Sequence, residues 1–517
     1  MTYSPPLAST LSNTRLRTPS HRSPFSGMCA ACSADCPGTC EITLSAVRGT
    51  EALLPYLADI NQFASEKDYP VDFSHLAING RAFGAQGCPA EPGEATFPKA
   101  DINAAFGLKH PVPLTAPLLL PAMAKLNWQD YFSGAALAGV PVVIGEDVIL
   151  KDKGLVLEKG RVAEAPLLEA MVKAFRAYDR GFGDVVVQAN ADDDRLGVLD
   201  YALTRLGVRS VELKFGQAAK GIQGYGKVGS LADALRLVGM GYVVHPDPRD
   251  PEVAARYEKS QGPEFERIGQ LPLWDEAQLE ERVRALRSLG AQRICFKTGP
   301  FDPRDLVRIL RIASRNGVDL VTLDGAGGGT GNSPLKMMNE WGLPTVALEG
   351  MTAAILREMA AKGYALPQVA MAGGFVTEDQ VFKGLALGAP HIGLIAVGRG
   401  AMAAAMSAKN VGEAIKSGNA PKEHARFGNT IEAVFTHYRE LKGLYGAGAA
   451  EISPGAAGVY SYLRRVSVGL RQLMALNRKF VVSAVSREDI YALTEAAACA
   501  TGLPTVSGLL QRALQEL

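Results

Sequence analysis

The chain has 517 residues, of which 47% are hydrophobic and 21% are charged, and its formal net charge is +1. This composition is typical of a soluble globular protein, and the near-neutral balance gives no argument for nucleic acid or an anionic membrane as a partner. We also expect no membrane span, since the sequence lacks a run of about 18 apolar residues.

Residues 1–25 are rich in Ser, Pro and Thr and lack the apolar core of a signal peptide, which predicts a flexible tail. The chain holds seven cysteines, and four of them lie together in the next region, residues 26–110. This distribution does not suit a secreted disulfide scaffold. It favours a reducing, cytoplasmic location.

The four clustered cysteines are Cys29, Cys32, Cys36 and Cys40, in the stretch CAACSADCPGTC. Four thiolates at such short spacing suit one [4Fe–4S] cluster or one structural zinc ion. We expect the iron–sulfur cluster, with zinc and free structural thiols as the alternatives.

Residues 111–405 repeat a short apolar run followed by an amphipathic segment. The apolar runs are 117–124, 141–147, 184–190, 210–216, 293–299, 320–329, 368–374 and 392–400. Their cores are continuous rather than alternating, as in parallel strands that are covered on both faces. Eight such repeats predict a (β/α)8 barrel, with an open doubly wound sheet as the alternative. Residues 406–517 are predicted to form a helical extension.

Glycines follow the last two predicted strands, at the end of a barrel where active sites form. Gly373 and Gly374 end the seventh strand, and Gly398 and Arg399 follow the eighth. Glycine allows the backbone to approach a ligand, its N–H groups can bind phosphate oxygens, and arginine can add a charge-assisted bond. We therefore expect a phosphate-bearing ligand here.

Two polar residues end other strands. Gln188 ends the third, and Lys297 ends the fifth. A lysine beside the pyrimidine edge of a flavin would stabilise the reduced ring, and a glutamine can both donate to that edge and accept from it. Alternatively, both residues only fill the polar mouth of the barrel.

The glycine-rich stretch DGAGGGTGNSP, at 324–334, contains Gly328 and Gly329. It matches neither the dinucleotide-binding fingerprint nor a P-loop. We expect it to lie against a flat ring or a substrate.

The fourth strand runs directly into KFGQAAKGIQGYGK, at 214–227. Lysines at a strand end supply fixed point charges, which suit a dicarboxylate. We expect Lys214 to point into the barrel mouth. For Lys220 and Lys227 a solvated loop is the alternative.

Several of these motifs resemble a known family. VELKFGQAAKGIQG, DGAGGGTGNSP, GLPTVALEG and MAGGFVTEDQVFKGLALGA occur in this order. Together they resemble the FMN-binding synthase domain of the glutamate synthase family, over roughly residues 110–480.

The resemblance implies an FMN lying near Met123 and Ala124, with Gln188 and Lys297 at its ring and its phosphate at the glycines after strands seven and eight. It also implies that Lys214, Gln217 and Lys220 face a 2-oxo acid. In the family's reaction ammonia adds to 2-oxoglutarate, and hydride from reduced FMN then reduces the imine.

Three features depart from the large glutamate synthases. The sequence lacks their glutaminase domain with its nucleophilic N-terminal cysteine, and residues 400–415 lack their cysteine motif after strand eight. Gly327 stands where the family has an Asp. We therefore expect an oligomeric complex in which partner subunits supply electrons and nitrogen.

Three other interpretations remain open. An N-methylglutamate synthase-type subunit would use methylamine in place of ammonia. An FMN oxidoreductase could act on a different amine or oxo acid. A non-catalytic assembly subunit could retain the barrel.

Overall fold

The computed structural model describes residues 46–47, 69–88, 91–123, 127–218, 221–222, 225–259, 265–272, 274–328 and 335–517. The tail at 1–25 and the four clustered cysteines lie outside these ranges. The metal site at those cysteines therefore stays a prediction.

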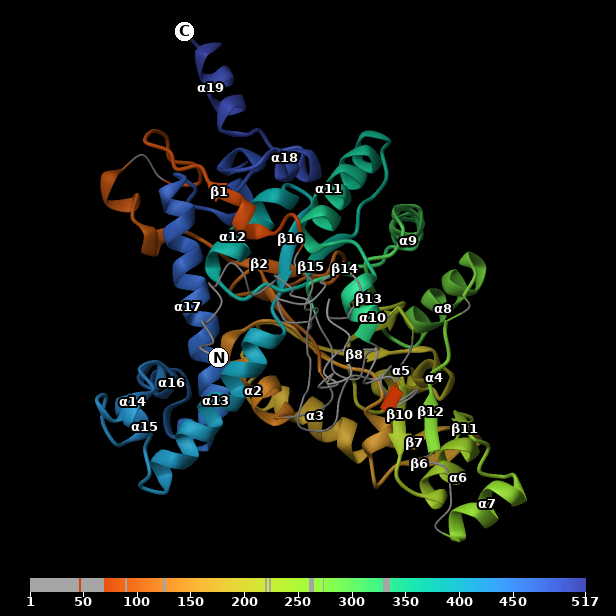
Figure 1. The fold of residues 1–517 in the computed structure, drawn as a ribbon. Coiled ribbons are helices and arrows are strands. Elements are labelled where there is room, and N and C mark those ends of the chain that lie inside the picture. Colours follow the sequence, from red (N-terminus) through yellow and green to blue (C-terminus); the bar gives the residue numbers. More distant parts are fainter. Residues whose placement is uncertain are drawn as a thin grey trace, which may run out of the picture.

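Eight parallel strands form a closed barrel in the middle of the chain (Figure 1). They are β4 (Leu118–Met123), β5 (Val142–Ile144), β8 (Val185–Ala189), β9 (Ser210–Lys214), β13 (Arg293–Thr298), β14 (Leu320–Asp324), β15 (Gln368–Ala372) and β16 (Ile392–Ala396). The ring closes where β16 pairs with β4, with Ile395 opposite Leu118. The predicted (β/α)8 barrel is confirmed, and the open-sheet alternative is wrong because the last strand pairs with the first.

Helices follow most of the strands and cover the barrel. They include α2 (Trp128–Ala138), α3 (Pro166–Arg176), α8 (Glu276–Ser288), α9 (Pro303–Arg315), α11 (Thr345–Ala361), α12 (Glu378–Gly388) and α13 (Arg399–Lys416). Asp275 caps α8 through a capping box, and Asp302 caps α9 ahead of a proline.

The amphipathic stretch DRLGVLDYALTRLG at 194–207, which follows the third apolar run, is interrupted rather than forming one helix. It lies across α4 (Ala191–Arg195) and α5 (Val198–Thr204), which meet at Gly197. Gly197 has φ +77°, and a Cβ there would lie 2.8 Å from a guanidinium nitrogen of Arg161. The chain turns at this glycine because no other residue type fits without strain.

A hairpin closes the amino-terminal end of the barrel. It consists of β2 (Ala104–Phe106) and β3 (Val112–Leu114), and it adds Phe106 and Leu114 to the apolar cluster inside the barrel. Arg293, at the start of β13, donates to the carbonyl of His110 at 2.6 Å. Because the hairpin covers this end of the barrel, a site can form at the opposite end, where the carboxyl ends of the strands lie.

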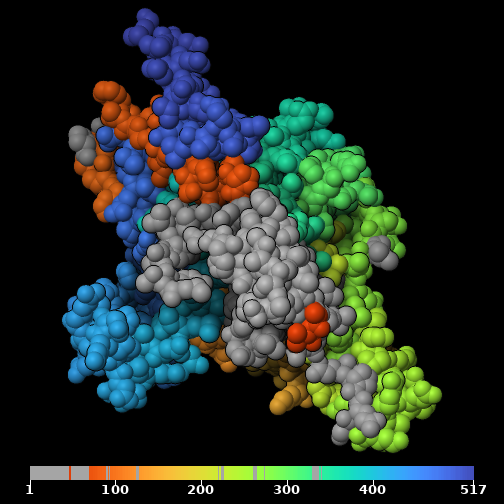
Figure 2. All heavy atoms as spheres, in the orientation of Figure 1, coloured from red at the N-terminus to blue at the C-terminus, as the bar shows by residue number. Residues whose placement is uncertain are grey.

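A small antiparallel sheet with two helices is inserted between β9 and β13. Its strands are β10 (Tyr225–Val228), β11 (Val243–His245) and β12 (Phe265–Ile268), with β12 in the centre. Its helices are α6 (Leu231–Gly239) and α7 (Pro251–Glu258). Figure 2 shows this insertion, in yellow-green, projecting from one corner of the molecule.

The segments before and after the barrel pack together. β1 (Leu76–Ile78) pairs antiparallel with β17 (Ile490–Ala492), and α17 (Pro454–Leu476) packs along α2 and α13. The remaining elements are β6 (Val156–Glu158), β7 (Arg161–Glu164), α10 (Leu335–Glu340), α14 (Lys422–Ala425), α15 (Ile431–Val434), α16 (Tyr438–Tyr445), α18 (Glu495–Thr501) and α19 (Val506–Leu514). Among the described residues, no helix has the length and apolar character needed to cross a bilayer.

Candidate active site at the carboxyl end of the barrel

A buried polar layer lies toward the carboxyl ends of β8, β9 and β13. Gln188 lies opposite Glu212 in the ladder between β8 and β9, and its Nε2 donates to Glu212 Oε1 at 2.5 Å. Burial raises the pKa of Glu212, and the nearby Lys297 cation opposes this shift. Gln188 keeps one buried oxygen, Oε1, that accepts no hydrogen bond from the described residues.

Lys214 lies in this mouth with two polar partners. Its ammonium forms an ion pair with Glu146 and donates a hydrogen bond to Gln217 Oε1. The side chain of Lys214 is almost fully buried, while that of Glu146 is 16% exposed. The structure therefore brings Lys214 and Gln217 together. It also places beside Lys214 the carboxylate of Glu146, two residues after the end of β5, the second barrel strand.

Lys297 lies beside Lys214, since the two residues are opposite each other in the parallel ladder between β9 and β13. Its Nζ lies 3.4 Å from Asp324 Oδ2, at the end of β14. The same carboxylate oxygen accepts a hydrogen bond from the backbone N–H of Ala218 at 3.2 Å. Asp324 thus connects Lys297 to the loop that follows Lys214.

The glycine-rich loops after β14 and β15 pack directly on each other. Gly373 has φ +123°, and a Cβ there would lie 2.4 Å from Thr345 Oγ1 and 2.7 Å from the carbonyl oxygen of Gly325. A Cβ on Gly328 would lie 3.1 Å from the Cα of Gly373. Part of the glycine content therefore serves close packing between the loops.

The end of β16 leads into α13. Gly398 is the N-cap of this helix, and Arg399 is its exposed first residue. The first N–H groups of a helix have no partner within it and favour anions. Gly374, with φ +99°, follows the neighbouring strand β15. This corner therefore offers helix N–H groups of the kind that bind phosphate.

Of the other predicted site positions, one lies within the described residues and three do not. Met123 ends β4, and its carbonyl accepts from the N–H of Gly145 at 2.8 Å. Ala124, Lys220 and Gly329 lie outside the described residues, so their assigned roles stay predictions.

The site also contains three carboxylates to which the sequence analysis assigned no role: Glu146, Glu212 and Asp324. Each lies at or near the end of a barrel strand, and Glu212 precedes Lys214 by two residues and so shares its face of β9. The positions of these carboxylates near strand ends could have identified them from the sequence. The lysine that each carboxylate approaches could not be read from the sequence.

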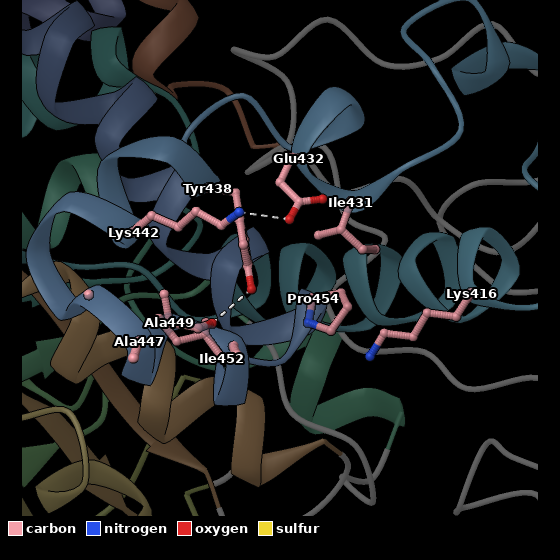
Figure 3. Close-up of a pocket in the computed structure, with 11 residues that line it drawn as sticks. Lys416, Ile431, Glu432, Tyr438, Lys442, Ala447, Ala449, Ile452 and Pro454 are labelled. Atoms are coloured by element: carbon pink, nitrogen blue, oxygen red, sulfur yellow. Dashed lines mark hydrogen bonds and ion pairs between the residues drawn. The ribbon is translucent and has the colours of Figure 1, made fainter.

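A separate pocket of about 480 Å³ lies in the C-terminal extension, between the end of α13 and the start of α17 (Figure 3). Lys442 on its wall is paired with Glu432 at 2.9 Å, and the Tyr438 hydroxyl donates to the carbonyl of Ala449 at 2.7 Å. No barrel strand lines this pocket, so it is distinct from the site above.

Comparison with known structures gives many matches of low similarity. Flavocytochrome b2 with sulfite bound has 13% identity and a TM-score of 0.47, with 85% of this chain and 81% of that chain covered. A soluble mutant of the membrane-associated (S)-mandelate dehydrogenase from Pseudomonas putida has 15% identity and a TM-score of 0.40, with 81% and 88% covered. Scores this low carry no argument for a reaction or a cofactor.

No curated protein matches the chain significantly. Residues 270–410, however, match the family model described as the conserved region in glutamate synthase. This range includes Lys297, Asp324, Gly373 and Arg399, whereas Lys214 lies before it. The resemblance to this family is confirmed in this range. Residues 270–410 are thus similar to the conserved region of the glutamate synthase family.

Proposed function

We propose that the protein is an FMN-dependent, glutamate synthase-like oxidoreductase that reductively aminates 2-oxoglutarate. The observation that carries this proposal is the pair of adjacent buried lysines, Lys214 and Lys297, at the carboxyl end of the barrel. The family match at 270–410 supports it.

The residues present fit FMN. The free oxygen of Gln188 suits a donor on the pyrimidine edge of the ring, and Lys297 suits the negative charge of the reduced ring. The N-terminus of α13 with Gly374 and Gly398 suits the phosphate. When bound, FMN supplies the hydride that reduces the imine carbon.

The chain's own residues would bind and orient the acid. Lys214 and Gln217 face a substrate carboxylate, and the ammonium of Lys214 exchanges Glu146 for that carboxylate when the acid binds. Asp324 keeps Lys297 oriented through the 3.4 Å contact. Residues mounted on rigid strands hold the imine carbon at reacting distance. Condensation of the 2-oxo group with ammonia releases water, and reduction of the imine adds a hydride to carbon and a proton to nitrogen.

Methylamine is the second candidate nitrogen donor, which would make the product N-methylglutamate. Gly327 favours it: this residue has φ +109° and presents no side chain where the family has an Asp. A larger amine would meet less steric and polar restriction there. An FMN oxidoreductase acting on another amine or oxo acid is the broader alternative.

We also propose that the enzyme works in a cytoplasmic, oligomeric complex, with other subunits that deliver electrons and the nitrogen donor. A [4Fe–4S] cluster at Cys29, Cys32, Cys36 and Cys40 would carry electrons to FMN, and zinc at these cysteines is the alternative.

The test is product analysis with the flavin-replete protein under chemical reduction. Reduced enzyme with 2-oxoglutarate and ¹⁵N-labelled ammonia should yield ¹⁵N-glutamate, and with methylamine N-methylglutamate. The presence of flavin without either product would reject this reaction and leave the broader oxidoreductase.

A further inference from the structure

Asp147 has an unusual backbone conformation at a position next to the proposed site. It has φ +64°, a left-handed conformation that non-glycine residues rarely adopt. It directly follows Glu146, the ion-pair partner of Lys214. Strained residues of this kind persist only where surrounding contacts hold them.

Contacts hold Asp147 on three sides. Its backbone N–H donates to Asp193 Oδ2 at 2.9 Å, and its Oδ1 accepts from Asn190 Nδ2 at 2.9 Å. Its Oδ2 accepts from Arg267 at 2.9 Å, in an ion pair whose side chains are 11% and 18% exposed. Asn190 and Asp193 belong to the segment after β8, whereas Arg267 belongs to β12 of the insertion.

Arg267 is itself fixed in place. It lies on the central strand of the inserted sheet, opposite Gly226 on one side and Val244 on the other. Its guanidinium lies 5.5 Å from the ring centre of Tyr242, a cation–π distance. Burial and the carboxylates of Asp147 and Glu146 raise the pKa of Asp193, which places Glu146 within the same electrostatic cluster.

We propose that Arg267 and Asp147 are positioning residues that set the geometry of the Glu146–Lys214 pair, and that the insertion is therefore a structural part of the active site. This inference rests on the role proposed above for Lys214. The left-handed turn at Asp147 directs the preceding carboxylate onto the lysine, and Arg267 maintains the turn. Without Arg267, Asp147 would be a partly buried carboxylate beside the acidic Asp193, and the turn would relax.

The reactivity of Lys214 toward an amine-acylating reagent tests this inference without any substrate. Acetic anhydride labelling of the flavin-replete protein, with peptide mass spectrometry, measures it. The ammonium of Lys214 is almost fully buried and held by Glu146, which shields it from the reagent, so loosening Glu146 should increase labelling of Lys214. Arg267→Met should increase it roughly threefold or more, a change expected for loss of a partly buried pair.

Three further variants keep the test decisive. Asp147→Asn retains a residue type that tolerates the left-handed conformation but removes the charge, and labelling should again increase. Arg267→Lys, which keeps the charge, should restore much of the protection. Arg249→Met is the matched control, because Arg249 pairs with Asp247 in the same insertion but at its exposed surface. It should leave Lys214 labelling unchanged.

Limited proteolysis checks that the insertion stays folded. If Arg267→Met unfolds it, the labelling of Lys214 in Asp147→Asn tests the inference instead. Unchanged labelling of Lys214 in folded Arg267→Met and Asp147→Asn would overturn the inference. An equal increase in Arg249→Met would do the same. Since no oxo acid or amine is used, failure of this test can be distinguished from failure of the proposed reaction.

Discussion

Lys214 and Lys297 lie opposite each other on neighbouring parallel strands, and each has its own carboxylate: Glu146 for Lys214 and Asp324 for Lys297. Two buried ammonium groups side by side would repel, and the carboxylates offset this charge. Both lysines are in electrostatic reach of the buried Glu212, and Lys214 also contacts the loop residue Gln217.

Lys214→Ala should raise the KM for 2-oxoglutarate by about tenfold or more while leaving the flavin bound, because a charge-assisted contact to the acid is lost. Steady-state kinetics and flavin absorbance measure the two effects. Lys173→Ala, which removes an exposed lysine paired with Glu169 on α3, is the control and should change neither. Loss of flavin from Lys214→Ala would show that this lysine holds the cofactor instead.

Lys297→Met should make the reduction potential of the bound flavin more negative by about 30 mV or more, since a cation beside the reduced ring is lost. Equilibrium titration against a reference dye measures the potential. If flavin-replete Lys297→Met has the same reduction potential as the wild type, Lys297 does not lie beside the flavin ring.

Gly373→Ala should destabilise the fold by about 2 kcal/mol or more and lower the flavin content. The added Cβ would meet Thr345 Oγ1 at 2.4 Å at a residue with φ +123°. Gly363→Ala is the matched control, because Gly363 has φ +79° but a Cβ added there would have no heavy atom within 4 Å. The control should cost about 1 kcal/mol and retain flavin. Similar losses in both variants would argue against a special role for the loop contact.

Glu349→Gln should stabilise the protein increasingly as pH rises. Glu349 is fully buried in α11, both of its carboxylate oxygens lack a hydrogen-bond partner among the described residues, and burial raises its pKa well above the usual value while Arg487 opposes the shift. The unfolded chain ionises this group at pH about 4.3 and the folded chain only at higher pH, so the wild type loses stability across that window. The slope is at most about 1.4 kcal/mol per pH unit. Urea unfolding at several pH values measures the difference, and a constant difference between pH 5 and 8 would contradict the assignment.

Cys32→Ser should remove iron and the broad visible absorbance of an iron–sulfur cluster from the purified protein. Metal analysis by mass spectrometry measures this directly. Unchanged iron content would leave zinc or free thiols as the explanation for the cysteine cluster.

The barrel strands could be predicted because continuous apolar runs with polar or glycine ends are a local pattern. The contact of Lys214 with Gln217 also spans only three residues. In contrast, Glu146 and Lys214 are 68 residues apart, so their pairing depends on how the barrel brings the second and fourth strands together. The inserted sheet was not predicted because its strands are short, and β11 exposes Val243 and His245.

Anaerobic reoxidation of chemically reduced enzyme tests the central claim most directly. The flavin absorbance should return when 2-oxoglutarate is mixed with ammonia or methylamine, and it should stay bleached with the oxo acid or the amine alone. A flavin-replete protein that remains reduced with both pairs would contradict the proposed reductive amination.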